Sequence, residues 1–180
     1  GDFVRSSFIQ RINSDLANDI GNLSQRTLSF VFKNLEGILP AVPKALQQED
    51  KQLIVAADGL LDSVRTSFDQ QAFHEGLKQI WEVVAAANRY IDQMAPWALR
   101  KTDPNRMADV LGVLLETIRQ VAILLQPIMP NSAEQLLDQL KVKSDERNFD
   151  SLGGAGRLIA GRKIDRPSGV FPRFSEDEAS

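Results

Sequence analysis

Apolar residues recur every three or four positions along most of this chain, which is the spacing of one face of an α-helix. The first pattern runs from residue 2 to about residue 36 without an internal proline, and Gly37 then favours a stop. Asp103 and Asn131 are suited to cap later helices, because their side-chain oxygens can accept bonds from free backbone N–H groups. The further helical patterns cover residues 48–68, 72–94, 104–125 and 131–140.

These patterns predict an all-α protein, an antiparallel bundle of four to five helices that occupies residues 1–142. The chain changes character in residues 143–180, where five glycines interrupt any helical pattern. Apolar residues such as Leu158 and Phe171 recur there, which argues against simple disorder. We expect this irregular C-terminal segment to wrap over the bundle or to dock on a neighbouring domain.

Composition removes several classes of function. The 180 residues include no cysteine and one histidine, His74, which excludes disulfides, thiol nucleophiles, cysteine-ligated zinc and multi-histidine metal sites. No glycine-rich phosphate loop and no nucleophile beside an activating base is present, so we assign no catalytic residue. No apolar run approaches the roughly 20 residues of a membrane span. We expect a cytoplasmic protein, and the start at Gly1 suggests a fragment or a processed chain.

A polar strip on the first predicted helix carries side chains suited to reading nucleic-acid bases. Asparagine and arginine present forks of hydrogen-bond donors that match the planar edges of bases. The same strip would serve equally well as the solvated face of a helix. The net charge of −3 gives no general basic footprint, so any nucleic-acid binding must rest on specific residues. The strip consists of Arg11, Asp15, Asn18, Asn22, Arg26, Ser29 and Lys33.

A tryptophan at a predicted helix break is the second candidate. Pro96 ends the helical pattern of residues 72–94, and Trp97 follows it directly. A large aromatic side chain in this position can close the end of the bundle. It can also remain exposed as a platform on which a base stacks, worth roughly 1–3 kcal/mol per base. The residues alone leave both interpretations open.

Three blocks together resemble the anticodon-binding domain of methionyl-tRNA synthetase, the helical bundle that follows the class I catalytic domain. The first block runs from Phe8 to Arg26, with Arg11, Asn13, Asp15, Asn18, Gly21 and Asn22 at matching positions. The second combines Asn88-Arg89-Tyr90-Ile91 with Ala95-Pro96-Trp97, and the third is Leu124-Leu125-x-Pro127-x-Met129-Pro130. The resemblance extends over essentially the whole chain, including the late Phe171-Pro172-Arg173.

The resemblance implies that this domain binds the CAU anticodon loop of a tRNA. It assigns base contacts to Asn22 and Arg26 and stacking to Trp97, which follows Pro96. It places Asn88 and Asp92 in the same site, where an acidic group would help to reject wrong anticodons. One acidic position that some family members carry a turn earlier is Ala85 here, so the chain departs from the family at that point.

The resemblance also sets a limit, because the family's ATP-binding motifs and zinc-binding cysteines are absent from this sequence. It implies a catalytic domain in the same polypeptide, which would hold ATP and zinc, and no cofactor in this chain. The alternative is a structural or protein-interaction bundle that binds no RNA. An exposed Trp97 beside Arg26 would favour the RNA-binding hypothesis, whereas a buried Trp97 with Arg26 paired elsewhere would favour the alternative.

Overall fold

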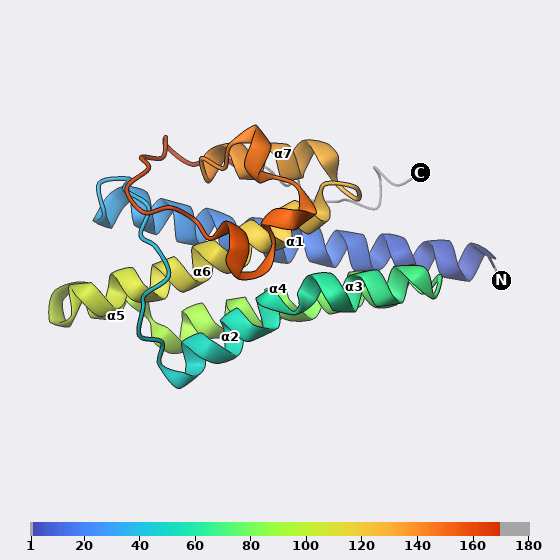
Figure 1. The fold of residues 1–180 in the computed structure, drawn as a ribbon, viewed down its shortest axis with the longest axis horizontal. Helices are drawn as coiled ribbons and strands as arrows, with labels where there is room; N and C mark the ends of the chain where they lie inside the picture. Colours follow the sequence, from blue (N-terminus) through green and yellow to red (C-terminus); the bar gives the residue numbers. More distant parts are fainter. Residues whose placement is uncertain (1, 170–180) are drawn as a thin grey trace.

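The computed structural model describes residues 2–169, with side chains from Ser7 onward. Within these residues the secondary structure is helical, which confirms the predicted all-α fold (Figure 1). Three single 3-10 turns follow the α-helices, at Ser144–Glu146, Phe149–Ser151 and Gly153–Gly156. The α-helices are α1 (Asp2–Asn34), α2 (Gln48–Asp58), α3 (Leu60–Asp69), α4 (Phe73–Met94), α5 (Pro96–Thr102), α6 (Pro104–Leu125) and α7 (Pro130–Gln139).

Three details differ from the sequence-based expectation. Helix α7 begins at Pro130 with Met129 as its cap, so Asn131 lies inside the helix and does not cap it. The pattern over residues 48–68 forms two helices that meet at Gly59, because α2 packs mainly against α6 while α3 packs against α4. Pro96, expected only to end a helix, also begins α5. Proline is well suited to this first helical position, since its missing N–H would have no partner in the helix there.

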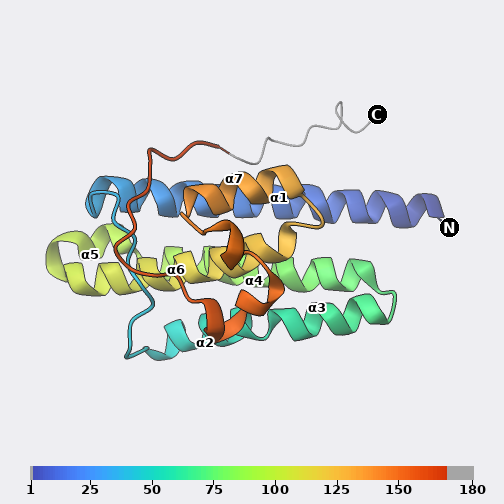
Figure 2. The same ribbon diagram turned by 45° about the horizontal axis from the view of Figure 1, so that its top comes forward.

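Helix α6 forms the centre of the bundle, and consecutive long helices alternate in direction around it (Figures 1 and 2). Every residue of α6 from Val110 to Leu125 is buried.

 The loop after α1 crosses α6 at Gly112, where an added Cβ would collide with the carbonyl oxygen of Ala41. A glycine is therefore required at this crossing.

A buried ion pair joins α2, α4 and α6. Asp50, which is fully buried, accepts two hydrogen bonds from the guanidinium of Arg106 at 2.7 and 2.8 Å and one from the Tyr90 hydroxyl at 2.6 Å. Burial disfavours the charge of Asp50, but these hydrogen bonds outweigh it and hold the pKa of the carboxyl below its ordinary value. Tyr90, part of the Asn88–Ile91 block, thus has a structural partner inside the bundle.

A second buried cluster fastens the C-terminal segment to the bundle. Glu116 of α6 is fully buried and pairs with Arg119 at 2.7 Å and with Arg157 at 2.8 Å. Arg157 also binds Asp58 of α2 at 2.7 Å, and an isolated backbone bridge joins Lys163 to the loop after α1. The segment up to residue 164 therefore packs over α2 and α6, whereas the predicted Phe171-Pro172-Arg173 stretch lies outside the described residues.

Candidate nucleic-acid interface

The relative position of α1 and α4 is fixed by Asp19. Its carboxylate accepts a hydrogen bond from the Trp81 indole N–H at 2.7 Å, and its backbone carbonyl accepts one from the Asn88 amide at 3.3 Å. The two helices run in the same direction, so residues beyond these contacts meet in register. Two turns after Asp19, Arg26 lies opposite Asp92.

Arg26 and Asp92 form an ion pair at the surface of this helix pair. One terminal guanidinium nitrogen donates to Asp92 Oδ1 at 2.7 Å, and the side chains are 35% and 65% exposed. The guanidinium carbon also lies 5.8 Å from the centre of the Trp97 ring. The structure therefore brings three of the predicted site residues together, with the arginine between the carboxylate and the indole.

The turn between α4 and α5 presents Trp97 to solvent. Ala95 adopts a left-handed conformation with φ of 47°, which ends α4 and redirects the chain. Pro96 is buried at the start of α5, and Trp97 follows with 48% of its surface exposed. Pro96 therefore helps to position Trp97. Because Pro96 is buried, its side chain is not accessible to a ligand.

The two predicted asparagines differ in their surroundings. Asn22 is exposed, and its side chain makes no hydrogen bond within the described part of the chain. The amide nitrogen of Asn88 donates to the backbone oxygens of Asp19 and Val84, both at 3.3 Å. The Asn88 carbonyl oxygen is buried and lacks a hydrogen-bond partner among residues 7–169. Asn88 therefore holds the helix pair together, and Asn22 is the one of the two that solvent reaches freely.

The family model for the anticodon binding domain of methionyl tRNA ligase matches residues 39–180. The chain belongs to this family. The methionine–tRNA ligase of Rhizobium meliloti is 48% identical to it over 179 residues, which cover 99% of this chain and 34% of the relative. That of Mycobacterium leprae is 42% identical over 182 residues, covering 99% and 33% of the two chains.

A solved structure shares the fold. The free-state crystal structure of Mycobacterium tuberculosis methionyl-tRNA synthetase matches with a TM-score of 0.84 at 43% identity, over 93% of this chain and 34% of that chain. The present chain thus spans about a third of the length of the relatives it matches, as their 33–34% coverage shows.

Sequence reasoning missed Asp19 and Trp81, which set the register of the helices that carry the family's candidate residues. Their side chains come from positions 62 residues apart, so no local spacing connects them. The sequence does contain a partial signal for Asp19. It precedes Asn22 by three residues and Arg26 by seven, so the three residues lie on the same side of the helix.

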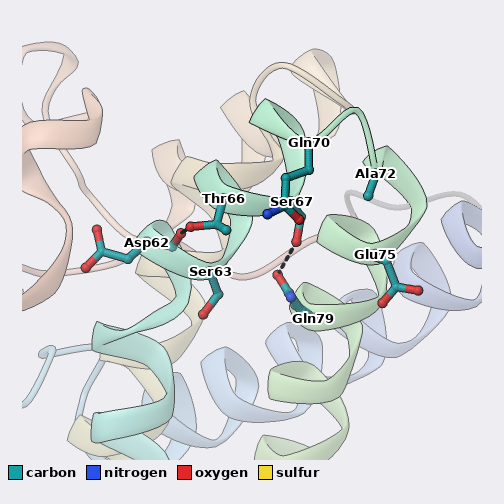
Figure 3. A pocket seen from close by; sticks show the side chains of 8 residues that line it. All are labelled: Asp62, Ser63, Thr66, Ser67, Gln70, Ala72, Glu75 and Gln79. Atoms are coloured by element: carbon teal, nitrogen blue, oxygen red, sulfur yellow. Dashed lines mark hydrogen bonds between the residues drawn. The ribbon is translucent and has the colours of Figure 1, made fainter.

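A cavity between α3 and α4 is a second candidate site, but it is poorly suited to bind RNA. It has a volume of about 530 Å³ and lies among acidic, hydroxyl and amide side chains (Figure 3). The Ser67 hydroxyl and the Gln79 side-chain oxygen lie 3.3 Å apart across it. Its lining includes Asp62 and Glu75 and contains no basic residue that could meet a phosphate.

The described residues contain neither a membrane-spanning helix nor a cluster of metal-ligating side chains. No helix within residues 2–169 is long and apolar enough to pass through a membrane. The histidine and carboxylate side chains in this part of the chain form no group of three or more that could hold a metal ion.

Proposed function

We propose that the chain is the tRNA anticodon recognition module of a methionine–tRNA ligase, the enzyme that joins methionine to its tRNA with the use of ATP. The module binds the CAU anticodon loop and carries no aminoacylation site. Membership of the anticodon-binding family and the likeness to methionyl-tRNA synthetase support this proposal.

The exposed Trp97 beside Arg26 is the observation that carries the proposal. An indole ring with 48% of its surface in solvent can stack on an unpaired base, because every base presents a flat face. The guanidinium 5.8 Å from the ring can then donate to the edge of that base or of its neighbour. This arrangement is the one that distinguishes the RNA-binding hypothesis from the structural bundle.

The remaining candidates complete the proposed site. Asn22 lies one turn before Arg26 on the exposed strip and offers both a donor and an acceptor to a second base. Asp92 orients Arg26 and repels acceptor groups of wrong bases. Asn88 supports the site indirectly by holding α4 against α1, since its amide donates to the Asp19 carbonyl and its own side-chain oxygen is buried. Half-buried Ala85 supplies no second carboxylate for rejection.

The proposal extends to the rest of the enzyme and to the C-terminal segment of this chain. A catalytic domain in the same polypeptide would hold ATP and zinc, and the protein would act in the cytoplasm. Residues 143–180 would wrap over the bundle or dock on that domain. Correct pairing at the anticodon would orient the distant acceptor end for methionyl transfer.

The test is a titration of the chain with an RNA hairpin that carries a CAU loop, against the same stem with a scrambled loop, at fixed salt. We expect a preference for CAU, and we expect Trp97→Ala to weaken CAU binding by about 1–3 kcal/mol. Trp97→Phe, which keeps a smaller stacking face, should retain part of the affinity. Equal binding of both hairpins, or identical binding by wild type and Trp97→Ala, would instead support a structural or protein-interaction bundle.

A further inference from the structure

A cavity near the C-terminal end of α1 is not used by the proposed anticodon site. It has a volume of about 220 Å³ and lies between the C-terminal half of α1 and the segment that follows residue 164. Figure 2 shows this segment passing along α1 after it leaves the bundle. Drug-sized ligands occupy sites of about 300–1,000 Å³, so this cavity suits a smaller, flat group such as one base. Ser29, Phe32, Lys33, Arg166 and Pro167 line it.

One wall of the cavity is an arginine held over an aromatic ring. The Arg166 guanidinium carbon lies 6.0 Å from the centre of the Phe32 ring. Phe32 is half-buried and packs against the core, so it is a fixed support, whereas Arg166 is exposed. A guanidinium plane supported in this way is a surface on which an RNA base can stack.

Lys33 and Arg166 differ from two neighbouring cations, which form ion pairs within the described part of the chain. Arg162 binds Glu146 at 2.9 Å and Lys141 binds Asp165 at 2.7 Å. Within residues 7–169, neither Lys33 nor Arg166 has a carboxylate partner. Two positive charges that meet no carboxylate in the described part of the chain favour a ligand that carries negative charge, such as a phosphate.

The polar strip of α1 leads from the proposed anticodon site to the cavity, because it carries Arg26 and two residues that line the cavity. Ser29 and Lys33 follow Arg26 at positions three and seven, and Lys33 is about 10 Å further along the helix axis. On a helical wheel, these two residues lie between the Arg26 side of the helix and the Phe32 side. An RNA strand that leaves Trp97 can therefore cross Ser29 and Lys33 and reach the cavity.

We propose that this cavity is a further nucleotide subsite, which takes one of the two loop nucleotides that flank the anticodon. Its base enters the cavity and stacks on the Arg166 guanidinium, and its phosphate meets the Lys33 ammonium group. The Ser29 hydroxyl accepts a bond from Gln25 at 3.3 Å and keeps its own hydrogen for the sugar or base. This subsite deepens the proposed anticodon recognition and rests on it.

The experiment measures binding of three CAU hairpins, one intact and two with an abasic nucleotide on the 5′ or the 3′ side of the anticodon. For the wild-type chain we expect one abasic hairpin to bind about fivefold or more weakly, on the scale of a lost stacking contact. In Arg166→Ala that difference should disappear, with intact-hairpin affinity lowered by a similar factor. Lys33→Gln should reduce the slope of log K against log salt by about 0.7.

A matched control variant and the CAU preference distinguish a failure of the subsite proposal from a failure of the anticodon proposal. Arg65→Ala removes one exposed positive charge from α3 and should leave all three affinities unchanged. Arg166→Ala should keep the wild-type ratio between CAU and scrambled loops, since it lies outside the anticodon site. If the wild type prefers CAU but Arg166→Ala shows the same abasic difference, the subsite is refuted and anticodon recognition stands. If the wild type shows no CAU preference, both proposals fail.

Discussion

The Arg26–Asp92 pair allows a sharp test of how a carboxylate contributes to base choice. Asp92→Asn keeps the size and shape of the side chain and removes its charge. One oxygen of Asp92 accepts the 2.7 Å bond from Arg26, and the other has no hydrogen-bond partner among the described residues. The substitution therefore loosens the guanidinium that lies beside Trp97 and removes one negative charge from the surface that faces the RNA.

The exposed fractions of the two side chains determine how much Asp92→Asn should change the stability of the fold. With side chains 35% and 65% exposed, the ion pair contributes about 0–1 kcal/mol to folding. For a chain of this size, Asp92→Asn should then lower Tm by no more than about 4 °C. A well-placed arginine contributes about 1–3 kcal/mol to base choice, so losing its orientation should reduce the CAU preference about fivefold to tenfold.

The assay is a double-mutant cycle with Arg26→Ala, using CAU and scrambled hairpins and thermal unfolding of each variant. We expect Asp92→Asn to lower the CAU preference while binding to the scrambled loop rises slightly, because a repulsive charge is gone. In the Arg26→Ala background the same change should lower the preference much less, because only the direct repulsion by Asp92 is then lost. An equal effect in both backgrounds would refute the idea that Asp92 acts through Arg26.

Two further predictions concern stability. Gly112→Ala should lower the free energy of unfolding by about 1–3 kcal/mol despite the better helix propensity of alanine, because its Cβ would meet the Ala41 carbonyl oxygen; a raised Tm would contradict this. The pKa of both Asp50 and Asp58 is lowered in the fold, since hydrogen bonds from Arg106 and Arg157 outweigh the effect of burial. Their contribution is therefore complete above the ordinary pKa of about 3.9 and is lost as the pH falls below it, which urea unfolding at pH 7, 5, 4 and 3 would measure.

The long helices could be predicted from sequence because each shows several turns of apolar periodicity. Helix α5 could not, since it has seven residues, fewer than two complete repeats of that pattern, and Pro96 resembles a stop signal as much as a start. The break at Gly59 was also hidden, because the periodicity continues across it while the packing partner changes from α6 to α4.

Burial of charge was the least predictable feature. Glu116 and Arg119 lie on α6 where sequence alone would place a solvated face, yet both are almost completely buried. The reason lies far along the chain, since Arg157 approaches this face and binds Asp58 across 99 residues of sequence. By contrast, the exposed positions of Asn22 and Arg26 follow from their spacing relative to the apolar face of α1.

The distribution of charge explains how an acidic domain could read RNA. The net charge is −3, but buried or paired carboxylates such as Asp50 and Glu116 are matched by arginines inside the fold and add little to the field outside. The proposed RNA surface depends on an indole, one oriented guanidinium, and the Lys33 and Arg166 cations, which meet no carboxylate among residues 7–169. Because stacking and base-edge contacts need little phosphate neutralisation, selectivity should survive at higher salt better than overall affinity does.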